Sequence, residues 1–434
     1  MKVIGLDTGT TTISGVLLDD GVVIDTCTLP NDAKTYTIAY ALQDAERILS
    51  LCEEILERLH AGTADAIALT GQMHGIVYVD DVGKACGSAV SWQDERGSLP
   101  WQDGLSFSAY MSRRTGYHLA TGYGLVTLYH DLQTGMVPDR AVKITTIPDY
   151  VAMRLADSRS PLVHITMAQS MGLYREETKD FDREAFRILG IDEKYLPEVC
   201  DEIRTVGLYC GKVPVYCALG DNQASVYGAC AGVSEALLNI GTGSQISLIC
   251  DAYVKVPGLD TRPYVDGKYI LSGSSLCGGS AYDVLASLVQ DILQRYDCPV
   301  PEQLVRDLDA AALEAGSAAG ITVDTRFRGS RAEPELTGMI TGINTENLTP
   351  GTLAYGFAEG VVRELHDFWQ LMPAAETVRD LSVSGNAVRS SELYRKCIRT
   401  WFPDMNIHVA EQKEEAAYGA ARYAGKIRQD PDGR

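Results

Sequence analysis

The sequence predicts an α/β protein built from two similar domains. Apolar, strand-like runs alternate with helical patterns along the 434 residues, which is typical of layered α/β folds. A chain of this length is too long for one compact core. An apolar strand, a Gly/Thr turn and a second apolar strand occur near residue 7 and again near residue 241, which indicates an internal duplication. We therefore expect an N-terminal domain over residues 1–219, a C-terminal domain over residues 220–434 and a ligand cleft between them.

The composition excludes some classes of partner. A formal net charge of −20 repels nucleic acid and anionic membrane surfaces, so we expect a small-molecule partner and neither of these; a homodimer stays open. The 11 cysteines are scattered without a C-x-x-C pair, which favours a reducing cytoplasm. A strand begins almost at the first residue, which leaves no room for a signal peptide. No apolar run approaches the roughly 18 residues of a membrane span.

The first half is expected to begin with a β-meander, in which Asp20 and Gly21 form a hairpin turn. Apolar residues at helical spacing follow, and then short buried strands. In order, the expected elements are strands over residues 3–7, 13–19 and 22–28, a helix over residues 41–59, and strands over residues 66–70 and 76–79.

The second half repeats the alternation of strands and helices. A Gly/Ser turn is expected over residues 272–279. The expected strands cover residues 215–219, 236–240, 245–250 and 381–384. A turn over residues 220–225 is expected to lead into a small-residue helix through residues 226–229, and further helices are expected over residues 282–296, 301–314, 353–371, 391–401 and 414–426.

Both Gly/Thr turns are predicted to bind phosphate. A tight turn exposes backbone N–H groups that bind anions, and the hydroxyls of Thr10, Thr11 and Thr12 add hydrogen bonds. Asp7 repels phosphate directly, so Mg²⁺, which uses few carboxylates and bridges to phosphates, is the natural intermediary. The second turn offers Gly241, Thr242 and Gly243 as phosphate contacts in the same way. The alternative is an ordinary Thr-rich hairpin at each position.

Six motifs occur in the order found in the FGGY carbohydrate kinases, and the sequence resembles that family over nearly its whole length. The C-terminal run over residues 415–421 also looks like this family. The six motifs are Asp7-Thr8-Gly9-Thr10-Thr11, Gly71-Gln72-Met73-His74-Gly75, Trp92-Gln93-Asp94, Gly220-Asp221-Asn222-Gln223, Gly241-Thr242-Gly243 and Ser384-Gly385-Asn386-Ala387.

The resemblance implies two ribonuclease H-like domains of the actin-like ATPase type that flank a cleft for nucleotide and sugar. It implies phosphoryl transfer from ATP, with Mg²⁺, to a sugar hydroxyl. In this reading Asp221 is the catalytic base, because a carboxylate at the end of a strand can accept the proton of the attacking hydroxyl. The alternative for Asp221 is a helix N-cap. Asp7 is the metal-side carboxylate, either directly or through a water; its alternative is a solvated turn residue.

The sugar pocket implied by the resemblance contains the Gln72-Met73-His74 run. His74 is expected to hydrogen bond the sugar, although a lone histidine is more often structural, and Met73 is also compatible with core packing. Trp92 can lie against the apolar face of the sugar or pack in the core, and Asp94 can hold two hydroxyls.

The adenine site is expected at Gly385 and Asn386, where the missing Cβ of glycine allows flat stacking; the alternative is a helix entry turn. The sequence departs from the family at two points. Many members have Gly-Gly at the adenine motif, and a lysine or arginine often stands near position 14, where this chain has Ser14. The absence of that cation bears on nucleotide affinity.

The best match among the family's substrates is sedoheptulose, converted to its 7-phosphate, because residues 120–124, 149–152 and 220–227 look most like those of kinases that act on this ketose. Xylulose, another pentulose or a polyol is the alternative. A catalytically inactive nucleotide-binding sensor on the same fold is a third reading. The absence of G-x-x-x-x-G-K-[ST] excludes a P-loop enzyme, the protein-kinase signatures are missing, and no spacing suggests zinc.

Overall fold

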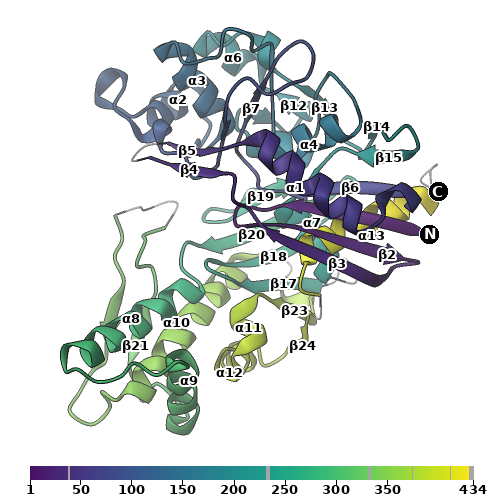
Figure 1. Ribbon diagram of the computed structural model, residues 1–434. Helices are drawn as coiled ribbons and strands as arrows, with labels where there is room; N and C mark the ends of the chain where they lie inside the picture. Colours follow the sequence, from purple (N-terminus) through teal and green to yellow (C-terminus); the bar gives the residue numbers. More distant parts are fainter. Residues whose placement is uncertain are drawn as a thin grey trace. The chain divides into compact units, whose positions relative to one another are not determined.

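The computed structural model describes residues 1–37, 40–230, 235–330, 333, 335–373, 375–410 and 412–429 (Figure 1). The chain forms two compact units. The first comprises Met1–Gly228, Pro263–Gly267 and Gln412–Arg434, and the second comprises Ala229–Arg262 and Lys268–Glu411. The C-terminal segment thus returns to the first unit, so the compact units do not follow a single boundary. The division at residue 219 stays a prediction about the functional halves.

The first unit is organised around a seven-stranded mixed sheet. Strands β1, β2 and β3 form the predicted antiparallel meander, whereas β6 lies parallel to β1, and β15 and β16 both pair with β6 in parallel. The carboxyl ends of β1, β6 and β16 therefore meet at one edge. The strands are β1 (Lys2–Thr8), β2 (Thr12–Asp19), β3 (Val22–Pro30), β6 (Ala66–Gly71), β14 (Thr205–Tyr209), β15 (Val213–Tyr216) and β16 (Leu219–Gly220).

Short sheets and helices complete the first unit. The short strands are β4 (Lys34–Tyr36), β5 (Ala41–Gln43), β7 (Val77–Val79), β8 (Ala89–Val90), β9 (Lys143–Thr145), β10 (Leu162–His164), β11 (Tyr174–Arg175), β12 (Asp180–Phe181) and β13 (Glu198–Cys200). The helices are α1 (Ala45–Arg58), α2 (Phe107–Thr115), α3 (Gly124–Thr134), α4 (Ile147–Leu155), α5 (Ile165–Ser170), α6 (Arg183–Leu189), α7 (Asp221–Ala229) and α13 (Glu415–Gln429).

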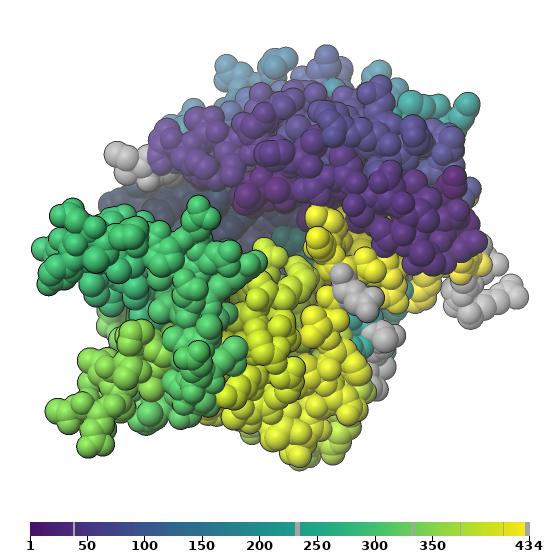
Figure 2. Space-filling view, turned by 60° about the horizontal axis from the view of Figure 1, so that its bottom comes forward, coloured from purple at the N-terminus to yellow at the C-terminus, as the bar shows by residue number. Residues whose placement is uncertain are grey.

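Helix α13 packs directly on the central strands, and its small residues make this possible. A Cβ on Gly5 of β1 would overlap the carbonyl oxygen of Ala417, and a Cβ on Gly419 would overlap that of Ala224 in α7. In Figure 2 the bright yellow residues nearest the C-terminus lie beside purple residues of the N-terminal part of the chain. The two ends of the chain therefore pack against each other, and α13 approaches both β1 and α7 closely.

The second unit has a six-stranded sheet that repeats the central part of the first. Strands β17 and β18 form an antiparallel hairpin and β23 lies parallel to β17, as β6 lies parallel to β1 beside the β1–β2 hairpin. The elements are β17 (Glu235–Ile240), β18 (Ser244–Cys250), β19 (Asp260–Pro263), β20 (Tyr269–Ser275), β21 (Thr322–Asp324), β22 (Met339–Thr341), β23 (Asp380–Ser384), β24 (Asn406–Val409), α8 (Gly279–Arg295), α9 (Leu304–Ala315), α10 (Pro350–Leu371), α11 (Asn386–Ser390) and α12 (Glu392–Trp401).

Several expected boundaries were wrong. Helix α7 begins at Asp221, within the stretch expected to be a turn. The first helix begins at Ala45 because the Asp44 side chain accepts hydrogen bonds from the backbone N–H groups of the first turn, and residues 41–43 form β5 instead. The strand expected over residues 215–219 divides into β15 and β16. Residues 272–275 belong to β20 rather than to a turn, since they pair with β18 along its length, and this pairing overrides the weak strand propensity of Gly and Ser. Within the described ranges, no helix is long and apolar enough to cross a membrane.

Candidate active site

The edge where β1, β6 and β16 end brings the two predicted carboxylates together. Thr8 pairs with Gly71, and Gly71 pairs with Gly220, so Asp7 lies one residue before the end of β1 and Asp221 directly follows β16. Gly71 permits this close approach, because a Cβ there would overlap the side chain of Thr8. Ligands in α/β proteins bind at such carboxyl ends of parallel strands.

The surroundings of Asp7 disfavour its ionised form. Its Oδ1 is buried and makes no hydrogen bond within the described part of the chain. Burial, and then the negative charges of Asp221 and Glu414, raise the pKa of Asp7 from 3.8 to about 8. An orphaned carboxylate oxygen beside two further carboxylates fits a divalent cation, because hard cations take oxygen ligands. Among the described residues, no group of three or more His, Cys, Asp or Glu side chains is arranged to hold a metal ion.

The threonine turn is ordered from two sides. The Asn31 side-chain amide donates to the carbonyl of Gly9 (3.0 Å), and the Asn31 N–H donates to the carbonyl of Thr11 (2.9 Å). The hydroxyl of Thr10 accepts a hydrogen bond from the Trp92 indole N–H (3.0 Å). Thr11 and Thr12 are exposed. The structure therefore places Trp92, which is 45% exposed, beside the predicted phosphate turn, a contact that the sequence did not reveal.

Gln72 and Met73 are buried rather than accessible. The Gln72 side-chain amide exchanges two hydrogen bonds with that of Gln43 (3.0 and 3.1 Å), and only 2% of the residue is exposed. Met73 packs with its sulfur against Gly220. Both residues thus support the strand ends under Asp221, and the predicted sugar contact of Gln72 is corrected to a structural one because its amide is already paired.

His74 presents a defined tautomer. Its Nδ1 lies 2.6 Å from the backbone carbonyl of Ser170, and its ring stacks on Tyr123 at 4.8 Å and 5°. Because a carbonyl only accepts, Nδ1 carries the proton and Nε2 is the acceptor in the neutral ring. The residue is partly buried, with a left-handed backbone (φ 73°) fixed by the hydrogen bond from its N–H to the Ser170 hydroxyl (3.1 Å). An acceptor so fixed is suited to a sugar hydroxyl.

Asp94 belongs to a buried ion-pair network. Its oxygens accept from the Arg96 guanidinium (2.7 and 3.1 Å) and from the N–H of Ala41 (3.0 Å), and it has no exposed surface. Arg96 also binds Asp131 at 2.7 Å, and Asp131 accepts from the Tyr78 hydroxyl at 2.9 Å. The predicted sugar contact of Asp94 is therefore corrected: this carboxylate holds the loop that carries Trp92. Sequence reasoning missed Arg96 and Asp131, because Asp131 lies 35 residues beyond Arg96.

The second unit contains a cavity of about 870 Å³ that is lined by residues of both motifs predicted to bind nucleotide. Gly241 and Thr242, from the turn between β17 and β18, line it together with Asn386 at the start of α11. Gly243 is not among the lining residues but closes the turn, since its carbonyl accepts the N–H of Gly241 at 2.9 Å. Gly385 has φ 94°, and a Cβ there would overlap the backbone of β17, so this position requires glycine. The volume suits a nucleotide.

Three residues in this cavity were missed by sequence reasoning. Tyr282 on α8 and Tyr394 on α12 lie with ring centroids 6.1 Å apart, and Asp309 on α9 lines the same cavity. Among the residues that the structure describes, no partner at normal hydrogen-bond geometry is found for the two buried tyrosine hydroxyls or for the buried Oδ1 of Asp309. Burial first, and then the charge of Asp309, raise the pKa of both phenols. Three separate helices form this polar cluster, so no local pattern signalled it.

The chain is similar to known proteins along its whole length. Residues 2–228 match the N-terminal domain of the FGGY family of carbohydrate kinases. The sedoheptulokinase of Mus musculus is 26% identical over 463 aligned residues, which cover 96% of both chains. The crystal structure of xylulose kinase from Rhodospirillum rubrum superimposes with a TM-score of 0.84 at 20% identity and covers 100% of this chain and 91% of that one. Glycerol kinase from Plasmodium falciparum, solved with ADP, gives a TM-score of 0.81 at 17% identity and covers 99% and 90%.

These structural matches confirm the expected α/β fold of the FGGY sugar kinases, a pair of ribonuclease H-like domains of the actin-like type. The matched N-terminal domain spans more than half of the chain. The chain therefore belongs to the FGGY family of carbohydrate kinases and is an enzyme that transfers a phosphoryl group to a carbohydrate.

Proposed function

We propose that the protein uses ATP and Mg²⁺ to phosphorylate a ketose, and that sedoheptulose, converted to its 7-phosphate, is its preferred substrate. The observation that carries the catalytic part of the proposal is the placement of Asp7 and Asp221 at the ends of two strands, β1 and β16, that both pair with β6 in one sheet. The similarity to the mouse sedoheptulokinase over 96% of both chains supports the choice of sugar. Structural similarity to xylulose kinases keeps xylulose, another pentulose or a polyol as the second candidate.

Asp221 would act as the general base. One of its oxygens accepts the N–H of Asn222 (2.7 Å), which fixes the carboxylate at the start of α7. A carboxylate in this position can take the proton of the attacking sugar hydroxyl as the new P–O bond forms. Positioning and charge stabilisation provide most of the catalysis of phosphoryl transfer, so one oriented base is sufficient.

The sugar would be held by residues of the first unit. His74 Nε2 accepts a hydrogen bond from a sugar hydroxyl, because Nδ1 is committed to Ser170. Trp92 offers an exposed indole face to the apolar side of the sugar. Met73 shapes the floor under Asp221 without a polar contact. These assignments predict that binding depends more on His74 and Trp92 than on Gln72 and Asp94.

The nucleotide would occupy the cavity of the second unit. Gly241 and Thr242 would contact the phosphates and Asn386 would border the base, while Gly243 and Gly385 would shape the two turns that carry them. Asp7 would hold Mg²⁺, directly or through water, with Thr10, Thr11 and Thr12 near the transferred group. When bound, Mg²⁺ neutralises phosphate charge and orients the transferred group.

A panel of sugars tests the proposed function. We expect ADP release to rise severalfold with sedoheptulose and less with xylulose, ribulose, fructose or glycerol, measured in a coupled assay at saturating ATP and Mg²⁺. A higher kcat/KM with xylulose would replace the preferred substrate and leave the kinase assignment intact. An absence of stimulation by every ketose and polyol would favour the inactive nucleotide-binding sensor.

The polar cluster in the cavity predicts base selectivity. The buried Asp309 oxygen is an acceptor, so it favours the exocyclic amine of adenine over the carbonyl oxygen of guanine. We expect kcat/KM for ATP to exceed that for GTP, and Asp309→Asn, which adds an amide donor, to reduce this ratio by roughly tenfold. Asp307→Asn, on the exposed side of the same helix α9, is the matched control. An unchanged ATP/GTP ratio in Asp309→Asn would remove Asp309 from the base site.

A further inference from the structure

Two cysteines outside the proposed active site lie close enough to react with each other. The sulfur atoms of Cys200 and Cys217 are 3.7 Å apart, and both thiols are reduced. Cys200 ends β13, and Cys217 follows β15. The residues are 6% and 1% exposed. A disulfide needs about 2.0 Å between the sulfurs, so bond formation requires the two side chains, and the segments that carry them, to adjust toward each other.

Cys217 lies a few residues before Asp221, the proposed general base, and hydrogen bonds hold the segment between them in place. Its N–H donates to the carbonyl of Arg204 (3.0 Å), the next N–H, of Ala218, donates to Asp149 Oδ1 (2.8 Å), and that of Gly220 donates to the Thr166 hydroxyl (3.2 Å). Asp221 follows immediately. A displacement of Cys217 therefore breaks these bonds or moves Asp221.

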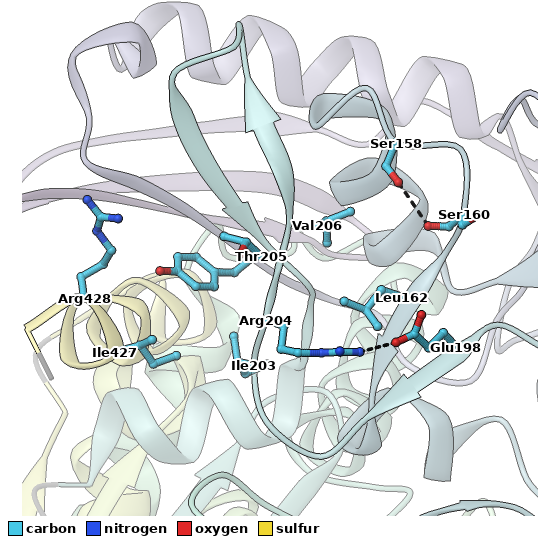
Figure 3. A pocket seen from close by; sticks show the side chains of 11 residues that line it. Ser158, Ser160, Leu162, Glu198, Ile203, Arg204, Thr205, Val206, Ile427 and Arg428 are labelled. Atoms are coloured by element: carbon cyan, nitrogen blue, oxygen red, sulfur yellow. Dashed lines mark hydrogen bonds and ion pairs between the residues drawn. The ribbon is translucent and has the colours of Figure 1, made fainter. Parts of the chain in front are cut away.

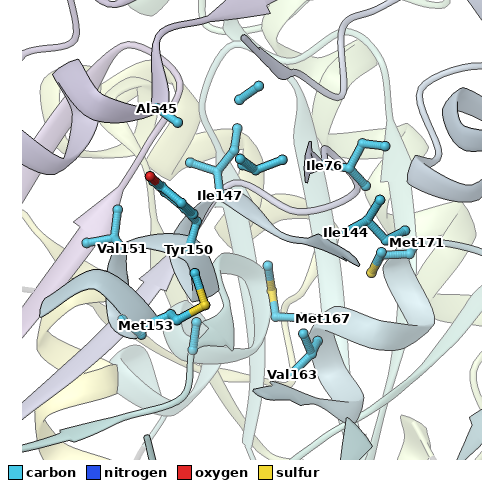
Figure 4. Packing of buried hydrophobic residues seen from close by; sticks show 14 of the residues in the cluster. Ala45, Ile76, Ile144, Ile147, Tyr150, Val151, Met153, Val163, Met167 and Met171 are labelled. Carbon is cyan, nitrogen blue, oxygen red and sulfur yellow. The ribbon is translucent and has the colours of Figure 1, made fainter. Parts of the chain in front are cut away.

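The partners of that segment are themselves firmly anchored. Asp149 belongs to α4 and Thr166 to α5. Neighbouring residues of these helices, Tyr150, Met153 and Met167, point into the hydrophobic core (Figure 4). Asp149 also accepts a hydrogen bond from the Thr146 hydroxyl (2.6 Å). Because α4 and α5 are held in the core, a shift of Cys217 toward Cys200 strains the hydrogen bonds of Ala218 and Gly220 to these helices, and Asp221 follows directly on this strained segment.

The surroundings distinguish the two sulfurs. Hydrogen bonding from Cys217, and then the Arg204 guanidinium, lower the pKa of Cys200 against the opposing effect of burial. The pKa of Cys217 is raised by its hydrogen bond to Cys200 and by burial. Cys200 therefore is the better nucleophile, since the thiolate is the reactive form, and Cys217 is suited to resolve the first product.

A cavity of about 840 Å³ lies beside Cys200. Glu198, two residues before Cys200, and Leu162, on the paired strand β10, line it together with Arg204. In Figure 3 the Arg204 side chain extends across this cavity toward Glu198, with which it forms an ion pair. Neither cysteine lines the cavity, but a small oxidant such as hydrogen peroxide that enters it meets Glu198 and Tyr216, which stand two residues before Cys200 and one before Cys217.

We propose that Cys200 and Cys217 form a dithiol that hydrogen peroxide converts to a disulfide, and that this bond switches phosphoryl transfer off by moving Asp221. The Cys200 thiolate attacks one peroxide oxygen, the O–O bond breaks, and the leaving hydroxide takes a proton to become water. The Cys217 sulfur then attacks the sulfenic sulfur of Cys200, the S–O bond breaks, and a second water leaves with the Cys217 proton. Two thiols and one peroxide thus give one disulfide and two waters, and an added dithiol reverses the change. The effect on activity rests on the proposed role of Asp221, whereas the thiol chemistry does not.

The test uses the full-length enzyme treated with hydrogen peroxide near stoichiometric amounts. We expect peptide mapping to show a Cys200–Cys217 disulfide, kcat to fall roughly 10- to 100-fold because a shift of about 1 Å in a catalytic group has such effects, and dithiothreitol to restore it. Hydrogen exchange at residues 217–221 is expected to change in parallel, which is a readout independent of kinase activity.

Matched variants separate this pair from other thiols. Cys200→Ser and Cys200→Ala are expected to keep their activity in peroxide. The Cys210→Ser/Cys298→Ser double variant, which removes the two exposed thiols, is expected to lose activity as the parent does. The proposal is overturned if no Cys200–Cys217 disulfide forms, if it forms without loss of activity, or if the double variant becomes resistant. If the disulfide forms and hydrogen exchange changes, but the protein phosphorylates no sugar, the proposed function is contradicted. The dithiol–disulfide conversion is then still supported.

Discussion

Replacing Asp221 by asparagine is expected to lower kcat for sugar phosphorylation by about 10²–10⁴-fold, the usual contribution of a general base. Asparagine keeps the shape of the side chain and can still accept the hydrogen bond from the Asn222 N–H, so the start of α7 is preserved. It cannot accept the proton of the sugar hydroxyl. The measurement is the initial rate of ADP release with the best sugar of the panel, at saturating ATP and Mg²⁺.

The control and a second readout make this result specific. Asp81→Asn removes an exposed carboxylate of the same unit and is expected to leave kcat unchanged. ATP binding, measured by calorimetry without sugar, is expected to be nearly equal in the parent and in Asp221→Asn, because the proposed nucleotide cavity is lined by residues of the other unit. A variant that keeps most of its activity would return Asp221 to the alternative role of a helix N-cap.

Local sequence patterns were sufficient to predict the strand ends and turns of the site. The β1–β2 hairpin, the strand before Gly71 and the strand before Asp221 each have their own apolar runs and turn residues. The rule that parallel strands end at one edge then predicts that Asp7 and Asp221 approach one another, as the register shows. Gly241 and Thr242 of the second hairpin and Asn386 likewise line one cavity.

The side chains that the sequence misassigned are those whose partners lie far along the chain. Gln72 is paired with Gln43, 29 residues earlier, and Asp94 shares Arg96 with Asp131. A motif shows that such residues stand near the site, but it does not show whether a partner already occupies their polar atoms. The same reason explains why Asp309 was missed, since its neighbours in the cavity come from two other helices.

Ser14, which stands where the family often has a lysine or an arginine, bears on the pKa of Asp7. In the β1–β2 register Ser14 stands directly opposite Asp7, and it is 1% exposed. Directly opposed residues of an antiparallel pair project from the same face of the sheet, so a lysine or arginine at position 14 would bring positive charge toward Asp7. With serine at this position, no positive charge offsets the effects of burial and of the two neighbouring carboxylates on Asp7, and its pKa is raised. We infer that a bound cation supplies the positive charge that a lysine or arginine at position 14 would bring toward Asp7.

Replacing Asp7 by asparagine is therefore expected to stabilise the protein at alkaline pH while it abolishes Mg²⁺-dependent activity. Folding raises the pKa of Asp7 from 3.8 to about 8, so between these values the folded state binds more protons at this site than the unfolded state does. The stability that Asp7 contributes is complete below pH 4, is lost as the pH rises to about 8, and stays lost above it. Asparagine carries no charge, so the difference in Tm between variant and parent should grow from pH 5 to pH 8 and reach roughly 2–6 °C.

Thermal unfolding between pH 5 and pH 9, with and without Mg²⁺, measures this difference. Asp149, whose pKa burial raises to about 7, titrates in an overlapping range, but it is present in both proteins, so its effect cancels in the comparison. Mg²⁺ at pH 8 should raise the Tm of the parent, since a ligand of the folded state stabilises it, and should leave Asp7→Asn unchanged. A Tm difference that does not vary with pH would show that Asp7 is not held protonated by its surroundings. If Mg²⁺ raises the Tm of both proteins equally, the ion binds somewhere other than Asp7. We expect it at Asp7 because, in the described part of the first unit, this is the carboxylate with a buried oxygen that has no hydrogen-bond partner.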